Sequence, residues 1–201
     1  MLIGLTGLYC AGKNHIAAFL EARGLPVLDV DKLGHIATEN MKEAVFSRFG
    51  EDLKNPDGSV NRRLLGEKVF GKPGELTVLE GIVHPEANRL TEEWVTAQNG
   101  KNCVINAALL HRSSVFERLD CIILVSAPRI VRLIRAKKRD KLPLTVLIKR
   151  LSSQRKFTSQ YLAVNADIYR VKNLGIGCPG KTGTKAERRI DAVLSKIGIC
   201  L

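Results

Sequence analysis

The sequence predicts an α/β fold in which helices cover a mainly parallel sheet. Short, almost continuously apolar runs are typical of parallel strands that are buried on both faces. Helical patterns separate these runs along the chain, which favours three layers. A glycine-containing loop follows the first run at once, as a ligand loop at the carboxyl edge of such a sheet would. The predicted strands are Leu2–Leu5, Pro26–Asp29, Cys103–Ala107, Cys121–Val125 and Ile168–Lys172.

The length and composition indicate one large domain with an inserted piece. The chain has 201 residues, which is enough for a sizeable core. Its hydrophobic content of 45% is that of an ordinary soluble globule. No apolar stretch approaches the length of a membrane span, and residues 1–30 look like a strand and a helix rather than a signal peptide. We therefore expect a cytoplasmic protein with no membrane partner.

The first predicted strand leads into a phosphate-binding loop. Gly7 and Gly12 are separated by four residues, and Lys13 starts a helical pattern that ends at Gly24. The N–H groups of such a loop and of the helix N-terminus bind an anion, and the lysine bridges the terminal phosphates of a nucleotide. Asn14 occupies the position where a Ser or Thr normally binds Mg²⁺. An amide oxygen can still ligate this ion.

Two carboxylates follow the second predicted strand. Asp29 and Asp31 are two residues apart, so they point the same way if the strand continues. One interpretation is that they simply cap the end of the strand. The other places both beside the phosphate loop, where one would hold Mg²⁺ through water and the other would accept a proton from an attacking hydroxyl.

A helical insertion is predicted next, because no convincing strand lies between Asp31 and Gln98. Apolar residues recur there at helical spacing, and turn signals at 55–58 and 72–74 divide them. A cover for the substrate is the natural role of such an insertion. The dipeptide His84-Pro85 is expected at a helix end, since proline restricts the residue before it.

A basic segment follows the fourth predicted strand. Residues 129–156 contain eleven Lys or Arg residues and one acid, within a chain of net charge +12. Arg132, Arg135 and Arg139 are spaced three and four apart, which places them on one helical face. A solvated face is one interpretation, and a lid that closes over ATP is the other. Nucleic-acid binding is disfavoured, because no aromatic residue interrupts the run.

At this point the chain resembles the dephospho-coenzyme A kinases, from Gly4 to about Gly175. Ordered short motifs carry the resemblance, and Asp-x-Asp together with Leu-x-x-Ile-x-His-Pro is the most selective combination. The motifs are Gly4-Leu-Thr-Gly7 with Gly12-Lys13, Val27-Leu-Asp-Val-Asp31, Phe49-Gly50, Asp57-Gly58 through Arg62 to Leu65, Val69-Phe70, Leu79 to Pro85, Leu109-Leu110, Arg135-x-x-x-Arg139-Asp140, Gln154, Ala166-Asp167 and Asn173-x-Gly175.

The resemblance implies a P-loop kinase-like three-layer fold with a five-stranded parallel sheet. It divides a single domain of residues 1–201 into a core of about 1–35, 100–128 and 164–201, a coenzyme A-binding insertion of about 36–99, and a lid of about 129–163. It implies transfer of the γ-phosphate of ATP to the ribose 3′-hydroxyl of dephospho-coenzyme A, with Mg²⁺ as cofactor. The expected partners are these two small molecules, with no nucleic acid.

The resemblance also assigns site residues by position. The catalytic residues would be Lys13, Asp31 as base, and Arg139 from the lid. ATP would be bound by Gly7, Cys10, Ala11, Gly12, Lys13, Asn14, His15, Arg135, Arg139, Asn173 and Gly175. Dephospho-coenzyme A would be bound by Asp29, Asp31, Arg62, His84 and Leu109, and Mg²⁺ by Asn14 and Asp29.

The sequence departs from the family pattern at the loop and after the third strand. Asn14 and His15 replace hydroxyl residues, and residues 8–11 make the loop bulkier than usual. Arg112 stands where the family has an acid. An active kinase is the leading hypothesis, and a degenerate protein that binds nucleotide or coenzyme A is the alternative. The Asp-x-Asp and His-Pro elements argue against a different small-molecule P-loop kinase.

Overall fold

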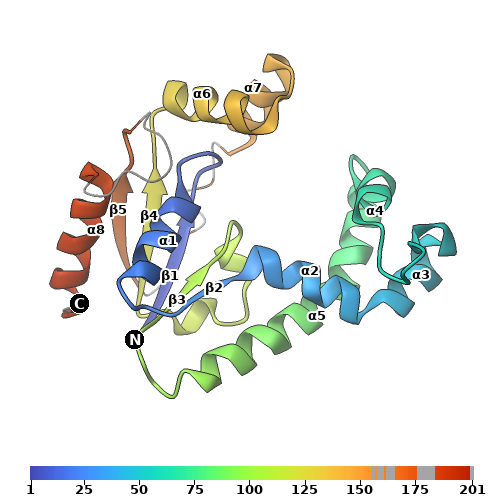
Figure 1. Cartoon of the computed structure of the whole chain (residues 1–201), viewed down its shortest axis with the longest axis horizontal. Helices are drawn as coiled ribbons and strands as arrows, with labels where there is room; N and C mark the ends of the chain where they lie inside the picture. Colours follow the sequence, from blue (N-terminus) through green and yellow to red (C-terminus); the bar gives the residue numbers. More distant parts are fainter. Residues whose placement is uncertain (155–156, 158–160, 162–165, 176–183, 200–201) are drawn as a thin grey trace. The chain divides into compact units, whose positions relative to one another are not determined.

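The computed structural model describes residues 1–154, 157, 161, 166–175 and 184–199. The chain forms two compact units. Figure 1 shows the helices and strands, coloured by residue number. We call Met1–Leu28 with Gln98–Leu201 the sheet unit, and Asp29–Ala97 the helical unit. The predicted insertion of about residues 36–99 falls largely within the helical unit. This unit begins at Asp29, where a helix starts directly after the second strand with no loop between them.

The sheet has five strands in the order β2-β3-β1-β4-β5. The central strand β1 pairs in parallel with β3 on one side and with β4 on the other, and β4 pairs in parallel with β5. The predicted five-stranded parallel sheet is therefore confirmed. The chain leaves β1 and β3 toward opposite sides, which places the switch point for ligand binding at the carboxyl end of β1. The strands are β1 (Leu2–Gly7), β2 (Val27–Asp29), β3 (Cys103–Asn106), β4 (Cys121–Ser126) and β5 (Asp167–Lys172).

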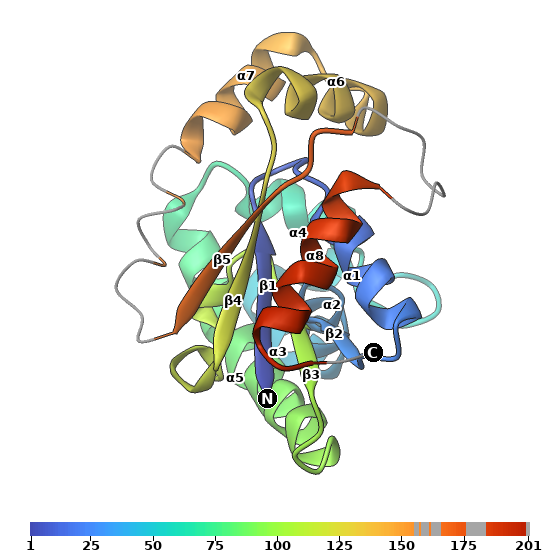
Figure 2. The ribbon, with the colours of Figure 1, turned by 90° about the vertical axis from the view of Figure 1, so that its left-hand side faces the viewer.

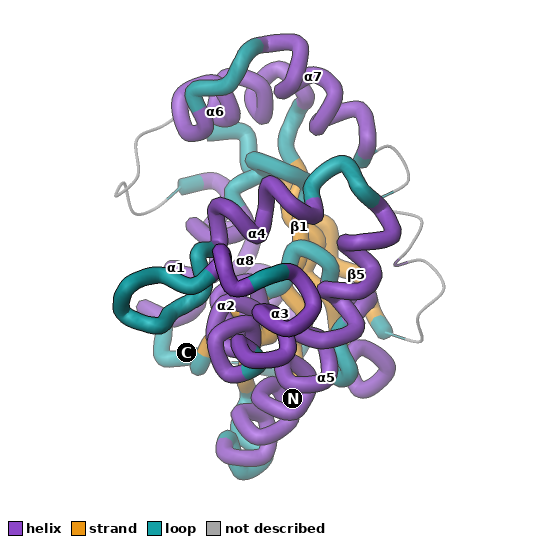
Figure 3. The backbone as a smooth tube through the Cα atoms, turned by 90° about the vertical axis from the view of Figure 1, so that its right-hand side faces the viewer, coloured by secondary structure: helices purple, strands orange, loops and turns teal. Residues whose placement is uncertain are grey.

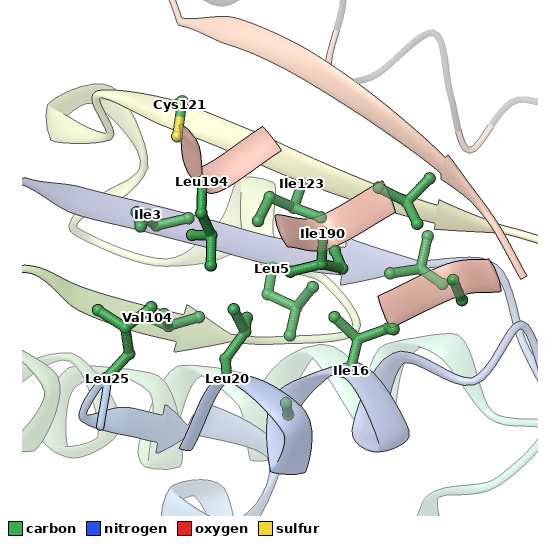
Figure 4. Close-up of a cluster of buried hydrophobic side chains, with 14 of the residues drawn as sticks. Ile3, Leu5, Ile16, Leu20, Leu25, Val104, Cys121, Ile123, Ile190 and Leu194 are labelled. Atoms are coloured by element: carbon green, nitrogen blue, oxygen red, sulfur yellow. The ribbon is translucent and has the colours of Figure 1, made fainter. Parts of the chain in front are cut away.

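Helices α1 (Lys13–Ala22) and α8 (Lys185–Lys196) cover one face of the sheet. Each helix presents apolar residues at a spacing of four, and these meet the odd-numbered residues of β1 in one buried cluster (Figure 4). Burial of each such Leu or Ile side chain contributes about 1.5–3 kcal/mol. The cluster includes Ile3, Leu5, Ile16, Leu20, Ile190 and Leu194.

Two 3₁₀ turns pack against the other face, η2 (Leu110–Arg112) and η3 (Phe116–Arg118). Gly4 of β1 allows this close packing, because a Cβ atom there would lie 2.6 Å from Cδ2 of Leu110. The ring of Phe116 also meets the buried ring of Tyr161 edge to face, with centroids 6.0 Å apart. The sheet is thus covered on both faces.

Two helices follow β4, namely α6 (Arg129–Asp140) and α7 (Leu144–Ser153). They lie beyond the carboxyl end of β4 in Figure 2. The helix α6 ends at Asp140, and the next residue, Lys141, has a left-handed backbone. Pro143 then precedes the first residue of α7. The predicted lid of about residues 129–163 begins with these two helices, and part of its remainder lies outside the described residues.

The helical unit consists of α2 (Val30–Asn40), α3 (Lys42–Phe49), η1 (Glu51–Leu53), α4 (Arg62–Val69) and α5 (Pro73–Ala97), drawn in purple in Figure 3. Its main core joins α3, η1 and α4 through apolar side chains at helical spacing. An isolated antiparallel bridge pairs Lys54 with Val60 across the predicted turn. The buried residues of this core are Val45, Phe46, Phe49, Leu53, Val60, Leu65 and Val69.

The expected helix end at Pro85 is wrong, because α5 continues through this residue for 25 residues in all. Proline removes one helical hydrogen bond, but Val83 before it and Ala87 after it are both buried against Ala37 of α2. Packing of both halves against α2 outweighs the local preference. Within the described residues, no helix combines the length and apolar character that crossing a bilayer requires.

Candidate active site

The loop between β1 and α1 leaves the N-terminus of α1 open to an anion. Gly12 is the residue before the helix, and in the described chain no side chain caps the helix there. The first N–H groups of α1 therefore face outward, together with the positive end of the helix dipole. Lys13 is the first helical residue, and the exposed Asn14 follows it. These features are those of a phosphate site.

Close packing fixes the two glycines of the loop. A Cβ atom on Gly7 would lie 2.7 Å from the carbonyl oxygen of Val125 in β4. Gly12 has φ of 96°, and a Cβ atom there would lie 2.3 Å from Nδ2 of Asn173. Cys10 adopts φ of 58° without being glycine, which costs about 1–2 kcal/mol. The surrounding contacts must hold the loop in this form.

Arg135 and Asn173 supply part of that support from α6 and from the end of β5. Arg135 Nη1 donates to the carbonyl oxygens of Ala11 at 2.8 Å and Cys10 at 3.2 Å. Its Nη2 donates to Asn173 Oδ1 at 3.1 Å and to the Gly175 carbonyl. Asn173 Nδ2 donates to the Ala11 carbonyl at 3.0 Å. One planar guanidinium thus joins the loop to the segment after β5.

Arg132 and Gln154 hold the loop at Tyr9. Arg132 Nε donates to the Tyr9 carbonyl at 2.9 Å, and the Tyr9 amide donates to Gln154 Oε1 at 2.7 Å. Arg132 Nη2 also donates to Gln154 Oε1, at 3.3 Å. The Arg132 side chain is only 6% exposed, and its burial lowers the pKa of the guanidinium. These bonds fix the main chain of the loop on both sides of Tyr9.

The side chain of Tyr9 contacts the end of α6. The Arg139 guanidinium carbon lies 5.1 Å from the centroid of the Tyr9 ring, and the Tyr9 hydroxyl donates to Asp140. Arg139 Nε donates to Asp140 Oδ1 at 2.6 Å. The hydrogen bond from Arg139 lowers the pKa of Asp140, whereas burial and then Asp140 raise the pKa of Tyr9. At neutral pH the phenol is therefore neutral and the carboxylate is charged.

His15 connects the first turn of α1 to α8. Its Nε2 lies 3.0 Å from Oε1 of Glu187, which is only 3% exposed. The other carboxylate oxygen of Glu187 accepts from the Thr184 amide at 2.8 Å, and the Thr184 hydroxyl accepts from the Glu187 amide at 3.2 Å. This capping box begins α8. The buried Glu187 thus takes part in the capping box of α8 and also contacts the side chain of His15, the residue after Asn14.

In the helical unit, Asp29 and Asp31 do not lie on one strand, because β2 ends at Asp29 and Asp31 belongs to α2. Asp29 ends β2 and is the N-cap of α2, since its Oδ1 accepts from the amides of Asp31 at 3.1 Å and Lys32 at 3.3 Å. Asp31 is an exposed residue in the first turn of α2. The strand does not continue, so the expected alternation does not apply. The capping interpretation holds for Asp29.

The remaining predicted substrate residues lie on separate elements. Arg62 is the first residue of α4, and its Nη1 lies 2.6 Å from Nδ1 of His35 in the same helical unit. His84 is half-buried within α5. In the sheet unit, Leu109 is 48% exposed before η2, and Arg112 ends that turn.

Within the sheet unit, the structure brings the loop together with Arg135, Arg139, Asn173 and Gly175, all of which the sequence singled out. Sequence reasoning gave no role to four residues that hold this site together: Tyr9, Asp140, Gln154 and Glu187. The spacing Thr184-x-x-Glu187 was a readable signal for the start of α8, but not for the contact with His15. Tyr9 was noted only as unusually bulky.

Comparison with known proteins agrees with this geometry. A family model for dephospho-CoA kinase matches residues 1–171. The dephospho-CoA kinase of Treponema pallidum is 31% identical over 98% of this chain and 96% of the relative, and that of Anaeromyxobacter dehalogenans is 35% identical over 93% and 89%.

Solved structures show the same fold. The protein TT1252 from Thermus thermophilus superposes with a TM-score of 0.80 at 30% identity, covering 98% of this chain and 97% of that one. Dephospho-CoA kinase from Campylobacter jejuni superposes at 0.63 with 24% identity over 98% and 96%. The phosphate loop, the parallel sheet and the family match lead to one conclusion: this chain belongs to the dephospho-CoA kinase family.

Proposed function

We propose that this chain transfers the γ-phosphate of ATP to the ribose 3′-hydroxyl of dephospho-coenzyme A, using the residues that the sequence analysis singled out. The N-terminus of α1 behind Gly12 carries the proposal, because a helix N-terminus without a side-chain cap suits a phosphate group, and the chain belongs to this family. The alternative of a degenerate binding protein gains no support. The loop, its lysine and the lid arginine are all present.

The phosphates of ATP would bind at the loop. N–H groups of residues 10–15 would surround them, and Lys13 would follow the charge onto the transferring group. Arg139 is suited to approach the same phosphates, because it lies on the Tyr9 side of the loop and its side chain is 61% exposed. Arg135, Asn173 and Gly175 would hold the loop on the nucleotide side.

Asp31 would accept the proton of the attacking 3′-hydroxyl. Its carboxylate is exposed at the start of α2, and its main-chain amide is held by Asp29 Oδ1. A carboxylate in this role must come within hydrogen-bond reach of the hydroxyl proton that it accepts. Dephospho-coenzyme A carries a diphosphate, so Arg62 beside His35 is a suitable contact for it on the helical unit. His84 and Leu109 complete the proposed substrate residues.

The donor set fits Mg²⁺. This ion keeps several waters and takes one or two protein oxygens besides the substrate phosphates, so the exposed amide of Asn14 beside Lys13 is an adequate ligand. When bound, Mg²⁺ would neutralise charge on the phosphates of ATP. Asp29 uses Oδ1 as the cap of α2, so its proposed contact with Mg²⁺, through water, would be made by Oδ2.

Two substitutions test this assignment. Lys13→Ala is expected to abolish turnover while circular dichroism and the unfolding temperature stay close to wild type. Asp31→Asn is expected to lower kcat by about a hundredfold or more with little change in ATP affinity, since a positioned base contributes about 10²–10⁴-fold. Retained turnover in Lys13→Ala would remove the loop from the mechanism. An unchanged kcat in Asp31→Asn would exclude Asp31 as the base.

A further inference from the structure

The main chain of Tyr9 is fixed more firmly than that of an ordinary loop residue. Its amide donates to Gln154 and its carbonyl accepts from Arg132, at 2.7 and 2.9 Å. Arg132 is nearly fully buried and bonds to Gln154 as well. The direction in which the Tyr9 side chain leaves the loop is therefore determined by the protein, without any ligand.

That direction leads to the last turn of α6. The Tyr9 ring provides a face for the guanidinium of Arg139 at 5.1 Å, and its hydroxyl donates to Asp140. Asp140 in turn accepts from Arg139 Nε at 2.6 Å and Nη2 at 3.3 Å. Arg139 is thus held from two sides, by an aromatic face and by a carboxylate that Tyr9 itself orients.

The charges of this cluster suit a polyphosphate. Arg139 and Arg150 both pair with Asp140, at 2.6 and 3.7 Å, so the three side chains carry one net positive charge. Asp140 is 15% exposed, whereas Arg139 is 61% exposed. The anchoring acid is therefore mostly covered, while the cation remains accessible on the loop side of α6. An aromatic face adds attraction for the guanidinium without cancelling its charge.

The geometry points to Tyr9 as a positioning residue that holds Arg139 over the phosphate loop for the transition state. This inference rests on the proposed function, because it assigns Arg139 the phosphate contact made there. The large side chain of Tyr9, which makes this loop bulkier than usual, then serves to position Arg139. The ring links the loop that binds the phosphates to the helix that carries the lid arginine, so the two are aligned together.

A double-mutant cycle tests the inference through kcat and the KM for ATP. Tyr9→Leu is expected to lower kcat about tenfold with a smaller effect on the KM, because the lost contact acts on the transferring group. Tyr9→Phe keeps the ring and is expected to lose only about two- to threefold. In the Arg139→Ala background, Tyr9→Leu should have no further effect, since its action passes through Arg139.

A second tyrosine offers a matched control. Tyr169 in β5 also donates to an aspartate, Asp167 at 3.4 Å, and also lies under a cation, with Lys196 Nζ 5.4 Å from its ring centroid. Asp167 is the first residue of β5, so this pair lies toward the amino end of its strand, whereas the phosphate loop follows the carboxyl end of β1. Tyr169→Leu should therefore leave kcat and the KM for ATP unchanged, even if it lowers the unfolding temperature.

The outcomes separate this inference from the proposed function. Equal fold-losses for Tyr9→Leu in the wild-type and Arg139→Ala backgrounds would overturn the inference alone. Full activity of Arg139→Ala would overturn both the inference and the proposed role of Arg139. A spectroscopic readout does not need turnover: in the wild-type protein the Arg139 side-chain proton signals should be shifted by the Tyr9 ring current, and Tyr9→Leu should abolish the shift. Its absence in the wild type would contradict the contact.

Discussion

The side-chain nitrogen of Asn173 lies 2.3 Å from the point where a Cβ atom on Gly12 would stand. The same nitrogen donates to the carbonyl of Ala11 at 3.0 Å. Asn173 follows β5 and Gly12 precedes α1, so two segments far apart in the chain approach each other through an atom that only glycine leaves room for. The shape of the phosphate loop depends on this contact.

Gly12→Ala should therefore damage both the loop and the fold. We expect a loss of about 1–3 kcal/mol in the free energy of unfolding and at least about a tenfold rise in the KM for ATP, because the added methyl displaces Asn173 and strains a left-handed residue. The control is Gly24→Ala at the other end of α1, where φ is 85° and nothing lies within 4 Å. If both variants keep the wild-type KM, the contact is not needed for nucleotide binding.

Asn14 should govern the dependence on Mg²⁺. Asn14→Ala is expected to raise the free Mg²⁺ concentration that gives half-maximal rate by about tenfold or more. Loss of a residue that only hydrogen-bonds to a metal ligand already lowers metal affinity by about that factor. Asn14→Ser should recover most of the loss, because a hydroxyl is the usual ligand at this position. The measurement is the initial rate at fixed ATP with free Mg²⁺ varied. Identical Mg²⁺ curves for all three proteins would exclude Asn14 as a ligand.

Glu187 should stabilise the sheet unit through two contacts. Glu187→Ala removes the carboxylate that accepts from the Thr184 amide in the capping box, and with it the partner of His15, so the free energy of unfolding should fall by about 1–3 kcal/mol. Asp191→Ala is the matched control, because its ion pair with Arg23 at 3.1 Å also joins α8 to the end of α1, but its side chain is 36% exposed, against 3% for Glu187. That pair should contribute at most about 1 kcal/mol. Equal losses in urea unfolding would show that the buried position of Glu187 adds nothing.

The stability of the helical unit should depend on pH through Glu86. Hydrogen bonds from Arg89 and then Asn40 lower the pKa of the Glu86 carboxyl to about 2. A folded-state pKa below the unfolded one adds stability that is fully present above the ordinary value of 4.5 and is lost as the pH falls toward 2. Glu86→Gln should therefore be less stable than wild type at pH 7, and the difference should shrink below pH 4.5. A difference that stays constant from pH 7 to pH 3 would contradict this assignment.

The parts of the fold that local pattern determines were predictable. Four of the five strands are short apolar runs, as buried parallel strands require, whereas β5 carries Asp167, Arg170 and Lys172 at the edge of the sheet. Each strand was placed within two residues of its observed ends. The phosphate loop was equally clear, because its glycines and lysine have fixed spacing. The passage from β2 into α2 was not readable, since a strand followed directly by a helix has no turn signal.

Features that depend on packing were not predictable. Proline predicted an end to α5, whereas burial of Val83 and Ala87 carries the helix through. The alternation of side chains along a strand predicted that Asp29 and Asp31 point the same way. Instead, the strand ends at Asp29, which caps the helix α2 that contains Asp31. The contact between Tyr9 and Arg139 joins positions 130 residues apart, and no local spacing encodes it.

The central claim is that this chain phosphorylates the ribose 3′-hydroxyl of dephospho-coenzyme A. The most direct measurement is incubation of the full chain with ATP, Mg²⁺ and dephospho-coenzyme A, with the product identified by mass spectrometry and by its ³¹P signal. We expect coenzyme A carrying a 3′-phosphate, formed at about 1 s⁻¹ or faster, the lower end for kinases, with no product from Lys13→Ala. Tight ATP binding without formation of coenzyme A would contradict the claim.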